Sequence, residues 1–394
     1  MQYNFDTIIP RDDTDSVKYD LRSDIFGFAS VLPMWVADMD FATPPFIIDA
    51  LKKRLEHPIL GYSFRSQSYF NALQKWLAHR HNWTIEKDWV AFSPGVVPAL
   101  NMALEAFTQK GDGVILQSPV YFPFFDAIKN NGCKLLDNPL LLTNGQYSID
   151  FKQLEELMPK ARVFMLSNPH NPGGCVWSTQ ELEKLANMCV KHNVLLFADE
   201  IHGDLVFEPN QFTPVAKLSP DIANGTITFT APSKTFNMAG LATSSVIISN
   251  PKLKAQFDAV VNRIHIGMGN VMGNVASEAA YTHGEEWLNE LMHYLAGNLD
   301  FMEAFMQAEL PELKMMRPEG TYLVWVDFSA LHFSDEELNN FMIHEAKLGL
   351  NRGSKFGENG KFFMRFNIAC PKALLEQGLN QLKSAINKRK ANGQ

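Results

Sequence analysis

The chain has 394 residues, 46% hydrophobic and 20% charged, which is typical of a globular protein with one large and one small domain, or two domains. The net charge of -8 and the lack of a basic groove argue against a nucleic-acid partner. No apolar run reaches the roughly 18 residues that cross a bilayer, and the N-terminus does not resemble a signal peptide. The four cysteines lack Cys-x-x-Cys spacing, so we expect reduced thiols, a cytoplasmic location, and neither disulfide nor metal site.

The first 30 residues are polar and mixed, and we expect an arm. An apolar run follows at 32–41, closed by two acids. Within it, the small Ala37 would permit close approach of the backbone to a ligand, although local grounds favour a plain turn. Helical periodicity then predicts helices over 46–55 and 68–81.

A change from strand to turn to helix occupies 90–107, with Gly95 in the turn. The N-terminus of a helix offers free N–H groups and a positive dipole to an anion. Because such junctions occur throughout α/β proteins, this segment alone is a weak indication of a phosphate site.

Strands and helices alternate from residue 113 to 249, which favours a mostly parallel, doubly wound sheet. Ligands in such sheets bind beyond the carboxyl ends of the strands. Asn171, Asp199 and Lys234 each follow an apolar strand, so we expect all three to converge on one crevice. The predicted strands are 113–116, 162–166, 194–198, 226–229 and 241–249, and the predicted helices are 121–129 and 178–191, the latter opened by a capping box.

Lys234 stands on a short connection between two predicted strands, flanked by hydroxyl side chains. Partial desolvation or a nearby cation would lower its pKa and make it a nucleophilic amine. A solvated surface lysine is the alternative on local grounds.

The last hundred residues read as a compact α+β unit. A long helix at 285–310 leads into it, followed by a strand at 322–328, a helix at 335–348, a strand at 362–368 and a final helix at 371–388. We therefore divide the chain into an N-terminal arm (1–44) joining the small domain, a large domain (45–287) and a small C-terminal domain (288–394).

A lysine, an aspartate, an asparagine, an aromatic ring and an anion site together match what pyridoxal phosphate requires. The cofactor needs an amine for a Schiff base, a carboxylate facing its pyridine nitrogen, donors to its phenolic oxygen, a stacking ring, and N–H groups around its phosphate. The chain supplies one candidate for each role, in the same order: Lys234, Asp199, Asn171, Tyr121 and the turn at 95–97.

The chain resembles fold type I pyridoxal-phosphate enzymes of the class I/II aminotransferase superfamily. It is most similar to the cystathionine β-lyase (C–S lyase) group of MalY/PatB type. Six segments carry the resemblance in family order across nearly the whole chain: 34–41, 93–99, 168–174, 199–202, 231–237 and 365–367.

The resemblance implies a role for each matching residue. Lys234 would form the Schiff base, Asp199 would pair with the ring nitrogen, Asn171 would donate to the phenolic oxygen, and Tyr121 would stack on the ring. Phosphate donors would be the backbones of Val96 and Val97 and the hydroxyls of Ser233 and Thr230. Arg365 and the backbone of Ala37 would bind the substrate α-carboxylate, and Tyr62 would reach the phosphate of the neighbouring subunit in a homodimer.

Two positions depart from the common aminotransferase pattern. Ala242 stands eight residues after the lysine, where many aminotransferases have an arginine that grips the phosphate. His202 stands three residues after the aspartate, where a tyrosine is frequent. Both departures fit the C–S lyase group, and we place His202 among the cofactor-binding residues and not in a metal site, because no second ligand lies at metal spacing.

The resemblance implies a lyase that cleaves L-cystathionine or related cysteine S-conjugates to a thiol, pyruvate and ammonia. An amino acid aminotransferase is the alternative, because both reactions begin with the same residues. A regulator that binds the cofactor without turnover would need an appended effector domain, and a binding protein of another class would show no cofactor absorbance.

Overall fold

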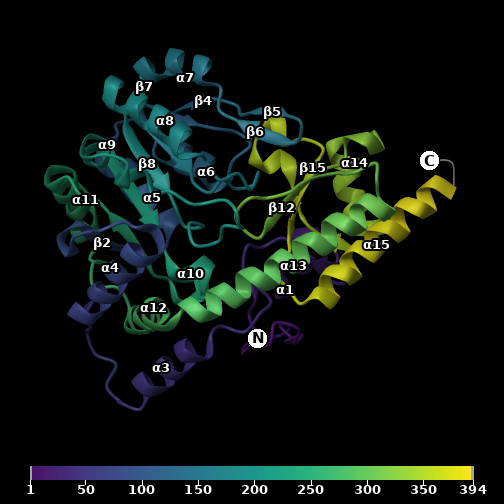
Figure 1. Ribbon diagram of the computed structural model, residues 1–394, viewed down its shortest axis with the longest axis horizontal. Coiled ribbons are helices and arrows are strands. Elements are labelled where there is room, and N and C mark those ends of the chain that lie inside the picture. The colour runs from purple at the N-terminus through teal and green to yellow at the C-terminus, as the bar shows by residue number, and fades with distance from the viewer. Residues whose placement is uncertain (1, 392–394) are drawn as a thin grey trace.

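The computed structural model describes residues 2–391, and its larger sheet has seven strands and lies in the left part of the view in Figure 1. Met1 and residues 392–394, the ends of the predicted arm and small domain, lie outside the described residues. Only β10 runs in the direction opposite to the other strands of this sheet, so the prediction of a mostly parallel sheet is confirmed. The strand order is β2 (Val90–Ser93), β10 (Ser244–Ile247), β9 (Thr226–Thr230), β8 (Leu195–Asp199), β7 (Ala161–Ser167), β3 (Gly113–Leu116) and β4 (Lys134–Asp137).

Helices cover both faces of this sheet, and alternate strand residues face opposite layers. On β7, Val163 and Met165 pack in one core cluster, while Phe164 and Leu166 pack in another. The first cluster joins α5 (Val96–Phe107), α6 (Pro123–Asn130) and α11 (Pro251–Arg263), and the second joins α7 (Phe151–Leu157), α8 (Thr179–His192) and α9 (Pro220–Gly225).

A second, antiparallel sheet lies towards the C-terminus. The long helix α13 (Glu285–Glu309) runs from beside α12 (Val271–His283) to α15 (Lys372–Ala391), as Figure 1 shows. The sheet has the order β11 (Lys314–Met316), β12 (Leu323–Asp327), β15 (Phe363–Asn367) and β14 (Asn351–Arg352).

The N-terminal segment pairs with the C-terminal part of the chain. It carries two short helices, α1 (Val17–Asp20) and α2 (Arg22–Phe26), and its strand β1 (Leu32–Pro33) pairs with β13 (Leu348–Gly349). The chain then forms α3 (Pro45–Leu55) and α4 (Gln67–His81), which pack against α12. A hairpin of β5 (Leu141–Thr143) and β6 (Gln146–Ser148) projects from the large sheet's side of the molecule.

Most predicted elements are present, and the differences lie at their ends. The predicted helix 335–348 comprises α14 (Asp335–Asn340) and a π-helical turn to Glu345, and Leu348 belongs to a strand that pairs with the arm. The predicted strand 241–249 is shorter, because Ala242 has a left-handed φ of 46° that ends a 3₁₀ turn. The predicted capping box is confirmed by Ser178 and Glu181. Within the described residues, no helix has the length and apolar character needed to cross a membrane.

Candidate active site

Three predicted residues meet at one edge of the large sheet. Asp199 ends β8, Asn171 follows β7, and Lys234 lies in the short helix α10 (Pro232–Thr235) after β9. Because these strands are parallel neighbours, their carboxyl ends share one edge. The cavity there has a volume of about 220 Å³, and its lining includes Ala37, Pro94 to Pro98, Tyr121, Ser167, Asn171, Asp199, Ile201, His202, Ser233, Lys234, Ala239 and Thr243.

The amine of Lys234 is partly buried and hydrogen-bonds to the backbone. Its Nζ donates to the carbonyl of Ala37 at 2.5 Å, and the hydroxyl of Tyr322 donates to the same oxygen at 3.0 Å. Desolvation, followed by the positive charge of Arg365, lowers the pKa of Lys234 to about 8. Part of the lysine is therefore neutral near pH 7, as a nucleophilic amine requires.

Asp199 is a buried carboxyl in the wall of the same cavity. Burial raises its pKa to about 7, against the opposing effects of the N–H of Ile201, which donates to it at 3.1 Å, and of Lys234. Such a carboxyl can share a proton with a basic nitrogen of a bound ligand.

Arg365 projects from β15 towards Asn171. Its Nη1 donates to Oδ1 of Asn171 at 2.9 Å, its Nη2 donates to the carbonyl of Trp35 at 3.0 Å, and its guanidinium lies 4.9 Å from the centre of the Phe356 ring. Desolvation lowers its pKa to about 10. A buried guanidinium whose recorded partners are all neutral suits an anionic ligand, since its planar fork matches a carboxylate.

Another part of the cavity lining offers neutral donors. Helix α5 begins after Gly95 with no side-chain cap, so the N–H groups of its first turn, including Val96 and Val97, are available to an anion. Ser233 and Thr243 line the same region, and the buried hydroxyl of Thr243 has no hydrogen-bond partner within the described residues.

Tyr121 and His202 are two further predicted cofactor-binding residues that line the cavity. Tyr121 precedes α6 and lines the cavity, and burial raises its pKa. Burial, followed by the charges of Lys234 and Arg365, lowers the pKa of His202 to about 3. His202 is therefore a neutral ring that can donate or accept a single hydrogen bond on each nitrogen according to its tautomer.

Two predicted residues lie away from this cavity. Tyr62 is 98% exposed on the loop between α3 and α4. Thr230 lines a separate small cavity beside Trp76 and Asp204. Conversely, the sequence did not single out Thr243 or Tyr322, because a threonine beside a strand and an aromatic residue at the start of one are ordinary core residues.

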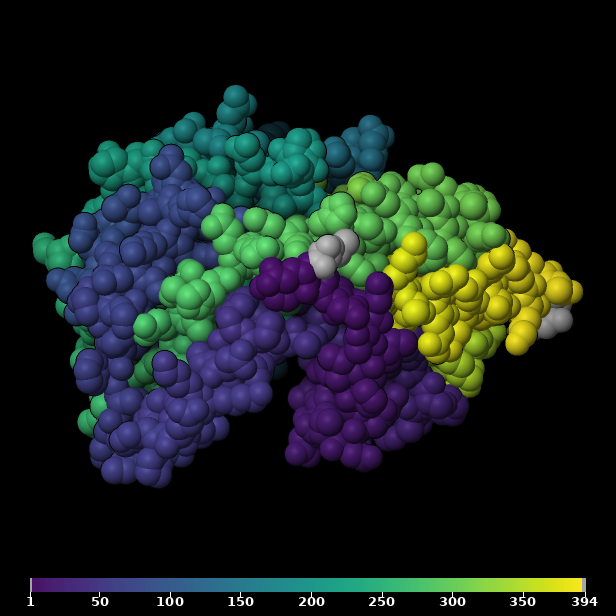
Figure 2. Space-filling view, turned by 60° about the horizontal axis from the view of Figure 1, so that its bottom comes forward, coloured from purple at the N-terminus to yellow at the C-terminus, as the bar shows by residue number. Residues whose placement is uncertain are grey.

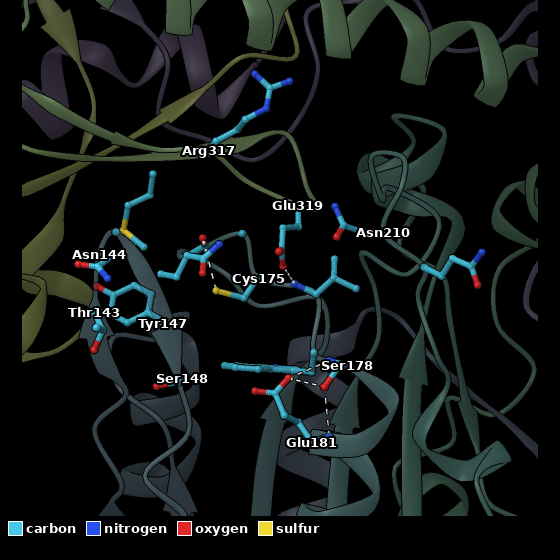
Figure 3. A pocket seen from close by; sticks show the side chains of 18 residues that line it. Thr143, Asn144, Tyr147, Ser148, Cys175, Ser178, Glu181, Asn210, Arg317 and Glu319 are labelled. Atoms are coloured by element: carbon cyan, nitrogen blue, oxygen red, sulfur yellow. Dashed lines mark hydrogen bonds between the residues drawn. The ribbon is translucent and has the colours of Figure 1, made fainter. Parts of the chain in front are cut away.

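A larger cavity of about 640 Å³ lies between the β5–β6 hairpin, the segment after Asn171, and residues 316–319 (Figure 3). Figure 3 shows Cys175, Ser178 and Glu319 around it. Burial raises the pKa of Cys175 to about 12, which keeps the thiol in its protonated, less nucleophilic form near neutral pH. None of the predicted catalytic residues lines this cavity, so the smaller cavity is the candidate active site.

The chain is similar to several known proteins over nearly its whole length. A cystathionine β-lyase named PatB, from Bacillus subtilis (strain 168), is 45% identical over 98% of this chain and 100% of PatB. A crystal structure of a PLP-bound putative aminotransferase from Clostridium difficile 630 has a TM-score of 0.96 and 43% identity, covering 98% of this chain and 100% of that one. A PLP-bound C–S lyase from Staphylococcus hominis has a TM-score of 0.91 and 34% identity, covering 98% of each chain.

These likenesses confirm the predicted type I fold, with its large parallel sheet and smaller second sheet. Residues 30–382 match the family described as aminotransferase class I and II. The chain therefore belongs to the class I and II aminotransferase family, as its motifs predicted.

Proposed function

We propose that this protein is a pyridoxal-phosphate-dependent C–S β-lyase that cleaves L-cystathionine or related cysteine S-conjugates. The observation that carries the proposal is the single cavity that holds the amine of Lys234 and the buried carboxyl of Asp199, with the guanidinium of Arg365 beside it. The full-length similarity to PatB, named as a cystathionine β-lyase, favours elimination over other reactions of this site.

The residues present fit the cofactor. The partly neutral amine of Lys234 would hold it covalently, Asp199 would face its ring nitrogen, and Asn171 and His202 would lie at its phenolic oxygen. The N–H groups at the start of α5 and the side chain of Ser233 would bind its phosphate, and Tyr121 would stack on its ring. When bound, pyridoxal phosphate supplies an electron sink for a carbanion at the substrate Cα.

The protein's own groups bind the substrate and move its protons. Arg365 takes the α-carboxylate, with the Ala37 backbone on its other side, and this orients the Cα–H bond towards Lys234. The freed amine of Lys234 removes that proton as general base, with its remaining N–H held by the Ala37 carbonyl. A thiolate leaves Cβ with the bonding electron pair, and water converts the remaining three-carbon fragment to pyruvate and ammonia.

An amino acid aminotransferase is the second candidate, because the Clostridium difficile neighbour is described as a putative aminotransferase. Both reactions need the same cofactor, the same base and the same carboxylate clamp. They differ in the fate of the carbanion, which expels a thiolate from Cβ in elimination and is reprotonated in transamination, and the residues of the cavity do not distinguish the two.

The deciding experiment mixes the holo-protein with L-cystathionine, without any keto acid, and follows pyruvate and free thiol together. We expect continuing, equimolar release of both, and none from the Lys234→Ala variant. A steady conversion of an L-amino acid to its oxo acid only when a keto acid is added would identify an aminotransferase instead.

A homodimer is part of the proposal. Apolar side chains are exposed from the end of α3 through the following loop, at Leu55, Ile59, Leu60, Tyr62 and Phe64. Contiguous exposed apolar side chains mark interaction surfaces. In Figure 2 this region and the N-terminal arm form two projections with a hollow between them, a shape suited to a second copy. Tyr62 would then reach the phosphate in the neighbouring subunit.

Hybrid dimers test this arrangement. The Tyr62→Ala and Lys234→Ala variants should each have reduced activity. When subunits of the two variants exchange in a mixture, half of the dimers contain one intact site, so the mixture should recover about a quarter of the parent activity. A mixture that recovers nothing, or a monomer in sedimentation analysis, would refute the shared site.

The division into an arm (1–44), a large domain (45–287) and a small domain (288–394) remains a proposal, supported by the pairing of β1 in the arm with β13. A cytoplasmic location is likewise a proposal, supported by the four cysteines, which are all unpaired. Limited proteolysis would test the domain division, and fractionation of cells would test the cytoplasmic location.

A further inference from the structure

Four charged side chains fasten the first part of the N-terminal arm, residues 11–18, to the segment 35–41 at its end. Nη1 of Arg11 donates to Asp40 at 2.7 Å, its Nη2 donates to Asp38 at 2.7 Å, and Nζ of Lys18 donates to Asp40 at 2.6 Å. Lys18 is 1% exposed and Asp40 is 5% exposed. We call Arg11, Lys18, Asp38 and Asp40 the ion quartet.

The same segment forms a wall of the candidate active site on its other side. The carbonyl of Ala37 accepts from Lys234 at 2.5 Å and from Tyr322 at 3.0 Å. Asn367 donates to the carbonyls on either side of Ala37, both at 2.6 Å. The backbone at Ala37 is therefore fixed between the ion quartet and the amine of Lys234.

A purely structural anchor is the simpler explanation for the ion quartet. Buried ion pairs contribute little net stability, however, because desolvation offsets their attraction. The charged groups that act on Lys234 are Arg365, Asp38 and Asp199, and the carboxylate of Asp38 favours the protonated amine. Arg11 neutralises that carboxylate, so the arm acts on Lys234 through charge as well as through geometry.

We propose that the ion quartet is a positioning device, in which Arg11 and Lys18 set the place of the Ala37 carbonyl and mask the charge of Asp38. The device holds Lys234 for removal of the substrate Cα proton. Arg11 and Lys18 are thus positioning residues, and the inference rests on the proposed function for the role of that amine.

The test compares Arg11→Met with Arg22→Met, a matched arginine on the same arm that pairs with Asp12 and makes no recorded bond to segment 35–41. Each full-length chain is freed of cofactor, and its capture of pyridoxal phosphate is followed by absorbance from pH 6 to 10. Capture requires the neutral amine, so the pH midpoint of the rate reports Lys234, and we expect about 8 for the parent.

Arg11→Met should raise the midpoint by about half a pH unit or more, because the unmasked Asp38 stabilises the protonated amine. Pyruvate formation at pH 7 should then fall about threefold and recover at higher pH, since half a unit is a threefold change in the neutral fraction. Arg22→Met should leave both unchanged.

Asp38→Asn removes the negative charge itself and should move the midpoint downward, so the inference remains testable if Arg11→Met fails to fold. The inference would be overturned by any of three results: the same pH midpoint of cofactor capture in all variants, a loss of capture rate by one factor at every pH, or a shift of the midpoint in Arg22→Met as large as in Arg11→Met. Cofactor capture does not depend on turnover, so a parent protein that makes no pyruvate would contradict the proposed function and leave this test standing.

Discussion

Replacing Arg365 by lysine tests the predicted carboxylate clamp. Arginine presents Nη1 and Nη2 in a planar fork already ordered by Asn171, Trp35 and the ring of Phe356. Lysine keeps the positive charge but offers one nitrogen, so at least one charge-assisted hydrogen bond to the substrate carboxylate is lost. Such a bond contributes about 1.5–3 kcal/mol, which corresponds to a decrease in kcat/KM of roughly 10- to 150-fold.

The assay is steady-state release of thiol from a cysteine S-conjugate, with most of the loss expected in KM. The same conjugate of cysteamine, which lacks the α-carboxylate, provides the double-mutant comparison. With that compound, parent and Arg365→Lys should differ by no more than about twofold.

Arg352→Lys is the matched control, because Arg352 lies in the neighbouring strand β14 and pairs with Asp335 outside the cavity. It should keep the parent kcat/KM within about twofold. If Arg365→Lys lowered turnover of both conjugates by the same factor, the reasoning would be refuted, since the loss would not depend on the carboxylate.

Three further predictions concern stability. Burial raises the pKa of Asp199 from 3.8 to about 7, so ionising this carboxyl lowers the free energy of unfolding as pH rises from about 4 to about 7. In urea unfolding without cofactor, Asp199→Asn should therefore be more stable than the parent by on the order of 2–4 kcal/mol at pH 8. At about pH 4 the two proteins should be equally stable. Gly174→Ala should lower the free energy of unfolding by about 2–4 kcal/mol in a thermal melt, because φ is +71° and the new Cβ would lie 2.4 Å from Pro318. Gly145→Ala is the control: its φ of +78° is similar but the space around it is open, so it should lower that free energy by only about 1–2 kcal/mol. Ser178→Ala should cost about 1 kcal/mol by removing the cap of α8, and an unchanged melting temperature would contradict that role.

Local patterns predicted the elements that carry strong periodicity or caps. The buried strands β7 and β8 contain apolar runs, β9 alternates threonine with apolar residues, and α8 begins at its capping box. By contrast, β5 is exposed along its whole length, and β13 and β14 have two residues each, so no hydrophobic period identifies them. Those short strands are paired by tertiary contacts, as when β13 pairs with the arm.

The sequence by itself determined the family, the parallel sheet and the convergence of Asn171, Asp199 and Lys234, because residues that follow neighbouring parallel strands share one edge. Only the tertiary structure decided what surrounds them. The resting place of Lys234 on Ala37 and the masking of Asp38 by Arg11 join segments far apart in the chain. Such contacts depend on how layers pack and on which charges lose their water, and no local pattern of residues specifies either.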